Sequence, residues 1–229
     1  MRRLVLSDEV LAEGPLRLPS DAAHYLRDVL RLDASVELEL TDGAGRVARA
    51  RIEHADKRSV VLNVSAPRFV PRPSRTLTLI QCVAKGEKMD QIVRQTTELG
   101  VSRIIPVISE RAVARSMGRQ DRWRQIVDDA VRVSGRAWRP ELRPVTAFAD
   151  LLAEARASTS WVFALDGATA YAPSTSPDLE VLVGPEGGLS PAEVEAAREA
   201  GFTSVSLGEH TLRTETAAAA ITALVMLAP

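Results

Sequence analysis

The segment that decides the fold is EVLVGPEGGLSPAEVEAAREAGFTSVSLG, residues 180–208. A short apolar run leads into a glycine-rich turn, and the turn leads into a helix start. Residues 190–193, Ser-Pro-Ala-Glu, supply a cap, a proline at the first helical position and a reciprocating glutamate. Gly201 predicts the end of this helix, and a second strand is expected at residues 203–207. Two strands joined by a helix indicate a parallel βαβ unit.

The same alternation of apolar strands with helices begins at Leu77. Continuous apolar runs predict further strands at residues 77–83, 103–108 and 161–165. Helices are expected at residues 87–99, 121–133, 146–155 and 214–227, the last two capped by Thr146 and Thr214. Continuous apolar strands separated by helices are typical of a parallel sheet that helices cover on both faces. The predicted fold class is therefore α/β.

The first 70 residues indicate a different, β-rich unit. Apolar and polar side chains alternate there with period two, which predicts strands at residues 36–40, 45–52 and 59–64. One helix is expected to begin after Ser20, because Ala23 and Leu26 belong to an apolar stripe with helical spacing. Short strands in so small a segment suggest a small β-barrel.

A stretch rich in proline and arginine, residues 67–73, predicts a linker between two domains. We expect a β-barrel domain at residues 1–70 and an α/β domain at residues 74–229. The length of 229 residues is sufficient for two such units, each with a core. A hydrophobic content of 45% excludes an intrinsically disordered chain.

Composition excludes several other classes of protein. Cys82 is the single cysteine, which excludes a disulfide scaffold and fits the reducing cytoplasm. The longest apolar stretch, residues 217–229, is too short to span a bilayer, and acidic residues near the start argue against a signal peptide. Three scattered histidines predict no metal site. We expect a cytoplasmic protein without a metal or a membrane partner.

The net charge of −1 conceals an uneven distribution along the chain. Residues 1–72 hold 12 basic and 11 acidic side chains, and residues 73–150 hold 14 and 9. Residues 151–229 hold only 3 basic against 10 acidic side chains. A basic middle region favours contact with a polyanion, although a solvated helical face explains any single arginine equally well.

Two loops carry the residues suited to chemistry. Residues 184–190, Gly-Pro-Glu-Gly-Gly-Leu-Ser, and residues 207–216 each follow a predicted strand and precede a helix. The carboxyl ends of parallel strands are where α/β proteins bind ligands. The glycine loop lacks the spacing of a nucleotide-phosphate loop or a dinucleotide fingerprint, and no nucleophile elbow is present. An ordinary tight turn is the other interpretation of this loop.

At these loops the sequence resembles a known family. Residues 184–190, Leu207-Gly208 and residues 212–217 (Leu-Arg-Thr-Glu-Thr-Ala) are similar to the signature of the bacterial RsmE family. These are SPOUT-superfamily methyltransferases that modify uridine at N3 in 16S ribosomal RNA. Residues 84–90 resemble the central segment of the family, and His24-Tyr25-Leu26 resembles its amino-terminal RNA-binding domain. Arg132-Val133 departs from the pattern, because the family more often has Glu-Gln there.

The resemblance implies several features of fold and assembly. SPOUT domains tie their carboxyl-terminal chain, here about residues 161–229, into a trefoil knot, although protein chains are otherwise almost never knotted. The preceding barrel would be PUA-like, and the active unit would be a homodimer that acts on 16S ribosomal RNA or the small ribosomal subunit. S-adenosylmethionine would bind inside the knot. The expected cofactor contacts are Leu182, Gly184, Pro185, Glu186, Gly187, Gly188, Leu207, Gly208, Leu212, Thr214, Thr216 and Ala217.

The chemistry of uridine N3 indicates which side chains are catalytic. The N3 proton must be lost before methylation, and the resulting negative charge needs a fixed positive group. Arg213 is the candidate for stabilising this anion. Glu215 is the candidate proton acceptor, with Glu186 and a water molecule as alternatives, because an acidic residue at a helix start is also stabilised by the helix dipole alone.

Arginine and lysine side chains are the predicted anchors for RNA phosphates. The expected RNA contacts are Arg2, Arg3, Arg27, Arg31, Lys85, Lys88, Arg111, Arg115 and Arg136. Two alternative functions remain open on sequence alone. One is a SPOUT enzyme that acts on tRNA or on a ribose 2'-hydroxyl, and the other is a non-catalytic RNA-binding or assembly protein.

Overall fold

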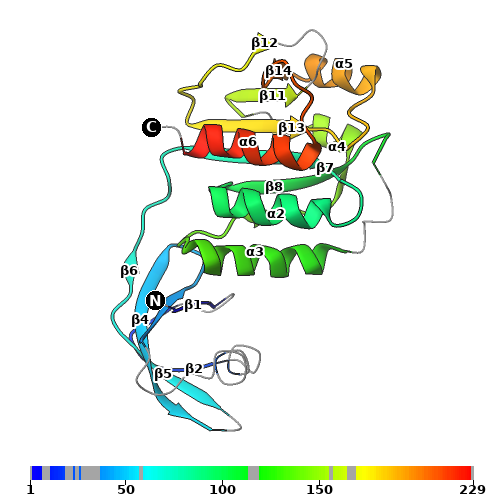
Figure 1. Ribbon diagram of the computed structural model, residues 1–229. Helices are drawn as coiled ribbons and strands as arrows, with labels where there is room; N and C mark the ends of the chain where they lie inside the picture. Colours follow the sequence, from blue (N-terminus) through cyan, green and yellow to red (C-terminus); the bar gives the residue numbers. More distant parts are fainter. Residues whose placement is uncertain are drawn as a thin grey trace. The chain divides into compact units, whose positions relative to one another are not determined.

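The protein folds into two compact units, each described by itself below (Figure 1). The computed structural model describes residues 2–6, 11–18, 23, 26, 37–56, 59–112, 119–154, 157–163 and 169–227. The first unit comprises Met1–Arg72 together with Val131–Arg139, and the second comprises Pro73–Ala130 and Pro140–Pro229. The boundary expected from the proline-rich stretch did not anticipate that residues 131–139 belong to the first unit.

The first unit is built on one mixed sheet. Its strands are β1 (Arg2–Val5), β2 (Gly14–Arg17), β3 (Glu37–Thr41), β4 (Arg46–Ala55), β5 (Val60–Val64) and β6 (Arg68–Phe69). Their order is β1-β3-β4-β5-β2, with β6 paired to β4. Side chains alternate between the two faces of each strand, so Leu38, Ala50 and Leu62 face a common core. Ala23 and Leu26 are buried in the same core.

The three strands expected in this unit are confirmed as β3, β4 and β5. Three more strands were not predicted, and one of them, β6, lies inside the expected linker. Apart from Ala23 and Leu26, the helix expected after Ser20 falls outside the described residues. Closure of this sheet into a barrel stays a prediction.

Residues 131–139 join the first unit through backbone hydrogen bonds to the turn between β3 and β4. Gly45 N–H donates to the Ala137 carbonyl at 2.9 Å, and Arg139 N–H donates to the Gly43 carbonyl at 2.8 Å. Thr41 Oγ1 also donates to the Ala137 carbonyl at 3.3 Å. These bonds link segments far apart in sequence, so no local pattern predicted them.

The second unit contains the predicted parallel sheet. Its strands are β7 (Thr76–Cys82), β8 (Arg103–Ile108), β9 (Glu141–Leu142), β10 (Thr146–Ala147), β11 (Thr159–Phe163), β12 (Thr169–Ala170), β13 (Asp178–Val183) and β14 (Thr203–Ser206). Their order is β10-β8-β7-β13-β11-β14-β12, with β9 paired to β8. Every described pair is parallel. The α/β prediction is confirmed.

Helices lie on both faces of this sheet (Figure 1). The helices are α2 (Lys88–Leu99), α3 (Gln120–Ser134), α4 (Phe148–Leu152), α5 (Pro191–Glu199) and α6 (Thr214–Met226). Ile80, Cys82 and Leu182 form a core with Leu151 of α4 and Ala197 of α5. The alternate residues of β7 face α6, which packs beside α2. None of the described helices has the length and apolar character needed to cross a membrane.

The capping residue predicted from the sequence is confirmed for one helix and is wrong for two others. Ser190 Oγ accepts from Glu193 N–H at 3.3 Å, and the Glu193 carboxylate accepts from Ser190 N–H at 2.9 Å, so the capping box is confirmed. Thr146 was expected to cap α4, but it lies in β10 and Ala147 is the cap. Thr214 was expected to cap α6, but Arg213 takes that position and Thr214 is the first helical residue.

Candidate active site

The two loops singled out in the sequence meet at one cavity beyond the carboxyl ends of β13 and β14. Its volume is about 410 Å³, which lies in the range of small-molecule sites. Residues 183–188 and 205–207 line it, with residues 210–214 and Ala217. Lys88 and Phe163 complete the wall. The structure therefore brings both loops to one cavity.

The glycine loop approaches its neighbours closely through its backbone. A Cβ atom on Gly184 would lie 3.1 Å from the Leu189 nitrogen, and one on Gly187 would lie 3.3 Å from Cδ of Arg111. Arg111 Nη1 donates to the Gly187 carbonyl at 2.8 Å. Gly188 has a φ of +68°, a conformation that other residues rarely adopt. The loop therefore depends on glycine for both space and backbone geometry.

A buried hydrogen-bond chain ties this loop to α6. Thr214 Oγ1 donates to the Gly184 carbonyl at 2.7 Å and accepts from Gln81 Nε2 at 3.0 Å. Gln81 also donates to the Cys82 carbonyl at 2.9 Å, while its Oε1 has no hydrogen-bond partner among the described residues. Sequence reasoning missed Gln81. The sequence feature that could have identified it is a single amide side chain within the apolar run at residues 77–83.

Charged groups from three segments meet at one side of the cavity. Lys88 Nζ lies 3.3 Å from a carboxylate oxygen of Glu186 and 3.9 Å from one of Glu215. Glu186 also accepts from Lys85 N–H at 3.0 Å. Burial raises the pKa of Glu186, but hydrogen bonds from backbone N–H groups and from Lys88 outweigh burial and hold this pKa below its ordinary value. Glu186 is therefore ionised.

The two predicted catalytic residues occupy different positions. Arg213 lines the cavity, is exposed, and makes no ion pair with any residue that the structure describes. Glu215 does not line the cavity; its side chain is 10% exposed, and its Oε2 lies 3.9 Å from Lys88 Nζ. One Glu215 oxygen, Oε2, has no hydrogen-bond partner within the described part of the chain. The structure brings Arg213 to the site and places Glu215 beside it.

Most of the predicted cofactor contacts line the cavity, and three do not. Leu182 faces the core on the α4 and α5 side of the sheet, since it follows the alternation of β13. Thr216 is exposed on α6, and Gly208 donates its N–H to Ser206 Oγ at 3.3 Å. Sequence reasoning missed several lining residues, although most adjoin the two loops. They are Phe163, Val183, Val205, Ser206, His210 and Thr211.

The described members of the predicted RNA contacts are divided between the two units. Lys88 lines the cavity, and Arg111 holds the glycine loop. Arg3 pairs with Glu39 at 2.7 Å, and burial lowers the pKa of Arg136 to about 10. Arg2 and Lys85 are exposed, whereas Arg27, Arg31 and Arg115 lie outside the described residues.

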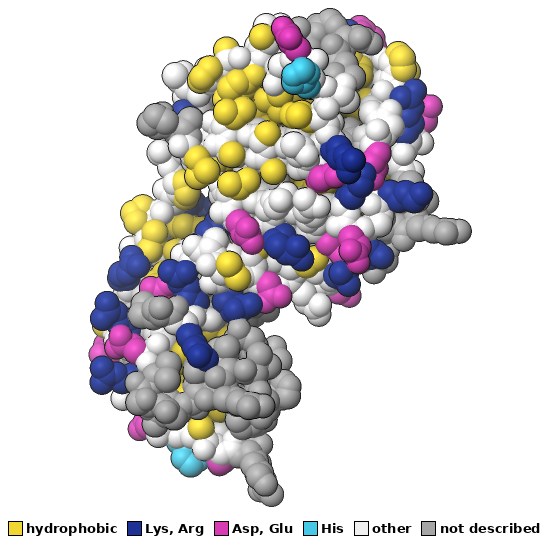
Figure 2. Space-filling model, viewed as in Figure 1, with side chains coloured by type: hydrophobic (Ala, Val, Ile, Leu, Met, Phe, Trp, Pro, Cys, Tyr) yellow, Lys and Arg dark blue, Asp and Glu magenta, His cyan; other side chains and the backbone are white. Residues whose placement is uncertain are grey.

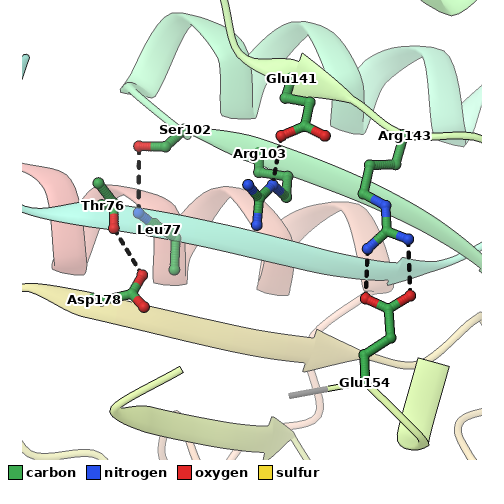
Figure 3. A network of polar contacts seen from close by, with 8 residues as sticks. All are labelled: Thr76, Leu77, Ser102, Arg103, Glu141, Arg143, Glu154 and Asp178. Carbon is green, nitrogen blue, oxygen red and sulfur yellow. Dashed lines mark hydrogen bonds and ion pairs between the residues drawn. The ribbon is translucent and has the colours of Figure 1, made fainter. Parts of the chain in front are cut away.

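The basic stretch at residues 103–143 is partly neutralised by internal ion pairs. Figure 3 shows Arg103 paired with Glu141, at 2.7 Å, and Arg143 joined to Glu154 by two hydrogen bonds. The same view shows Thr76 of β7 donating to Asp178 of β13 at 2.8 Å. These arginines therefore already have carboxylate partners, and the regional charge excess overstates the positive charge that is free to bind RNA. At positions 132 and 133, which depart from the family pattern, Val133 is 62% exposed and Arg132 has interaction partners.

No group of three or more metal-ligating side chains occurs among the described residues.

Family models match both parts of the chain. The model described as an RNA methyltransferase domain matches residues 71–226, and the model described as an RNA methyltransferase PUA domain matches residues 18–65. The first of these covers the whole cavity. Fold and site therefore define an RNA methyltransferase with a PUA domain.

Individual relatives narrow this class. Ribosomal RNA small subunit methyltransferase E of Aquifex aeolicus is 34% identical over 191 residues, which cover 80% of this chain and 82% of that protein. The same enzyme from Neisseria gonorrhoeae, solved bound to S-adenosylmethionine, superposes with a TM-score of 0.89 at 32% identity, covering 97% of this chain and 95% of that one. The chain belongs to the ribosomal RNA small subunit methyltransferase E family, which confirms the resemblance to RsmE.

A second solved structure agrees. A methyltransferase of Legionella pneumophila in complex with bound S-adenosylmethionine gives a TM-score of 0.88 at 30% identity, covering 97% of this chain and 94% of that one. Both comparisons include the cavity and the loops that form it.

Proposed function

We propose that this chain transfers the methyl group of S-adenosylmethionine to N3 of a uridine in 16S ribosomal RNA. One observation supports the proposal above all others. The glycine loop and the loop before α6 enclose a cavity of about 410 Å³ in a chain that is 32% identical to a Neisseria gonorrhoeae relative with this cofactor bound.

The residues of the cavity fit such a cofactor. Phe163, Val183, Val205 and Leu207 supply apolar walls that suit an adenine ring. The ionised carboxylate of Glu186 suits a ligand that carries positive charge. When bound, S-adenosylmethionine supplies an electrophilic methyl group.

The protein's own contribution is to stabilise the uridine anion. Loss of the N3 proton spreads negative charge over the two carbonyl oxygens of the base. Arg213, which has no ion-pair partner among the described residues, is the cation available to face that charge. Its guanidinium offers a planar fork of donors, which matches a base edge better than the single ammonium of lysine.

The position of the acidic groups favours water as the proton acceptor. Glu186 lines the cavity, but its lowered pKa makes it a weak base. Glu215 does not line the cavity and lies against Lys88 instead. We propose that Glu215 positions Lys88 and that the N3 proton passes to solvent, since the cation of Arg213 lowers the cost of the anion.

The fold and assembly implied by the family belong to the same proposal. We propose that residues 1–70 form a PUA-like barrel that binds RNA, and that residues 74–229 bind the cofactor within a trefoil knot at about residues 161–229. The path of α6 supports the knot, because α6 follows β14 yet packs against β7 and β13. We also place the protein in the cytoplasm, with 16S ribosomal RNA or the small subunit as its partner.

A homodimer is proposed on the surface of α6. Leu224 of this helix and Leu227, its C-cap, are 42% and 65% exposed, and hydrophobic side chains gather over the helix in Figure 2. An exposed apolar surface is costly in water and is typical of an interface.

Replacement of Arg213 with alanine tests the proposed function. We expect the methylation rate with saturating 16S RNA to fall by about 100-fold or more, as for loss of one preorganised donor. Calorimetric titration should show unchanged S-adenosylmethionine affinity, and Arg213→Lys should recover part of the rate. Arg94→Ala, at an exposed arginine of α2, is the matched control and should retain full activity.

Digestion of the methylated RNA to nucleosides identifies the product. 3-Methyluridine supports the proposal, whereas a ribose-methylated nucleoside supports the 2'-hydroxyl alternative. An Arg213→Ala protein that methylates at the wild-type rate contradicts the role given to Arg213. A wild-type protein that binds no S-adenosylmethionine contradicts the whole proposal.

A further inference from the structure

An exposed aromatic ring stands on the first unit at β6. Phe69 is 63% exposed, although phenylalanine is among the residues most often buried. Its ring packs edge to face against Trp138, with 5.7 Å between centroids and an interplanar angle of 89°. Both residues belong to the first unit, because residues 131–139 fold with it.

The aromatic pair is held in place by its surroundings. Trp138 Nε1 donates to the Val70 carbonyl at 2.9 Å. The indole lies directly against Gly45, where a Cβ atom would come within 2.4 Å of the ring and within 2.9 Å of the Phe69 ring. Gly45 therefore leaves the space that the two rings occupy. A fixed ring loses little conformational entropy when a ligand binds to it.

Two arginines lie next to these rings. Arg72 Cζ lies 4.2 Å from the centroid of Trp138, over its face. Arg46 is opposite Phe69 in the β4–β6 pairing, so the two side chains share one face of these strands. Arg72 forms no ion pair with any described residue, and Arg46 Nη1 lies 3.6 Å from Asp42 Oδ2. Figure 2 shows Lys and Arg side chains gathered over the region of β4 and β6.

We infer that this surface, formed by Phe69, Trp138, Arg46 and Arg72, binds a single-stranded segment of the RNA substrate. An unstacked base would lie on the exposed Phe69 ring, and the arginines would contact the flanking phosphates. One flat apolar ring among cations matches a polymer that alternates flat bases with negative charges. A protein partner usually needs a broader apolar core than a single ring. The inference rests on the proposed RNA substrate but assigns residues that the sequence did not single out.

Substitutions at Phe69 test the stacking contact. The probe is a fluorescein-labelled single-stranded uridine 12-mer, and its affinity is measured by fluorescence anisotropy. Phe69→Ala and Phe69→Leu should each weaken binding by about 5- to 150-fold, the range for loss of one base–aromatic stack. Phe69→Tyr should bind like the wild type, because it retains the ring. Val133→Ala, at another exposed apolar residue of this unit, is the matched control and should change nothing.

Salt dependence tests the arginines. Arg72→Ala should reduce the slope of log affinity against log salt by about one, as expected when one phosphate contact is lost. S-adenosylmethionine affinity should stay unchanged in all these variants, and circular dichroism should confirm that each is folded.

Three results would overturn the inference. The first is RNA affinity that does not depend on Phe69, and the second is a Phe69→Leu protein that binds like the wild type. The third is a change in molecular mass by light scattering in the Phe69 variants, which would assign this surface to protein contact. Failure here leaves the proposed function standing if the wild type methylates 16S RNA and Arg213→Ala does not.

Discussion

Replacement of Thr214 with valine should lower both the stability of the protein and its affinity for S-adenosylmethionine, while nearly the same side-chain shape is kept. Valine has nearly the same volume and branching as threonine but lacks the hydroxyl. In the wild type this hydroxyl donates to the Gly184 carbonyl at 2.7 Å and accepts from Gln81 Nε2 at 3.0 Å. The substitution therefore removes both bonds at once and separates the glycine loop from β7.

The expected magnitude follows from the groups left without partners. An unpaired buried polar group costs about 1–3 kcal/mol. Gly184 is only partly buried, so water can replace part of the lost bond, and Gln81 keeps its bond to the Cys82 carbonyl. We therefore expect the free energy of unfolding to fall by about 2 kcal/mol. The affinity for S-adenosylmethionine should fall by about tenfold, because Gly184 lines the cavity.

Urea unfolding and calorimetric titration measure these two quantities. Thr214→Ser is the matched control, since it retains the hydroxyl and should stay close to the wild type in both measurements. A double-mutant cycle with Gln81→Leu should give a coupling free energy of about 1 kcal/mol between the two side chains. The reasoning is refuted if Thr214→Val unfolds and binds like the wild type, or if Thr214→Ser is equally impaired.

Two further predictions concern stability and assembly. Burial raises the pKa of the Cys82 thiol from its ordinary 9.0 to about 12, so the free energy of unfolding should fall as pH rises from 9 towards 12. Between pH 8 and pH 10 the wild type should lose about 1 kcal/mol more than Cys82→Ala, and equal losses in urea unfolding would argue against this. Light scattering should show a dimer for the wild type and a monomer for Leu224→Glu; a fully active wild-type monomer at micromolar concentration would rule out the proposed interface.

Local signals explain which elements the sequence could predict. In the capping box at residues 190–193 all hydrogen bonds join residues that are close in sequence, so this helix start could be predicted without knowing the rest of the fold. The longer strands β7, β8, β11 and β13 are largely buried and appear as mostly apolar runs, whereas the short strands β9, β10 and β12 are at least partly exposed and carry no such signal. β6 was missed because prolines flank its two residues and its single partner strand lies far away in sequence.

Non-local contacts explain what the sequence could not predict. Residues 131–134 are the last turn of the amphipathic helix α3, yet residues 131–139 fold with the first unit, where Trp138 lies against Gly45. Gln81 interrupts an apolar strand in the sequence, and only its hydrogen bond to Thr214 explains why an amide is present there. Lys88 begins a helix and was assigned to RNA because of its charge. The pairing of distant segments gives each of these residues its role, and one sequence carries no direct record of that pairing.

The charge inside the cavity also differs from the charge of the regions that form it. The acidic carboxyl-terminal part supplies Arg213, a cation with no carboxylate partner among the described residues. The basic middle part supplies Lys88, whose ammonium is neutralised by Glu186 and Glu215. An anion formed in the cavity would therefore be stabilised mainly by Arg213, because the field of Lys88 is already largely cancelled by two carboxylates. For the same reason, substitution of Arg213 should cost more activity than substitution of Lys88, although both side chains carry one positive charge and line the same cavity.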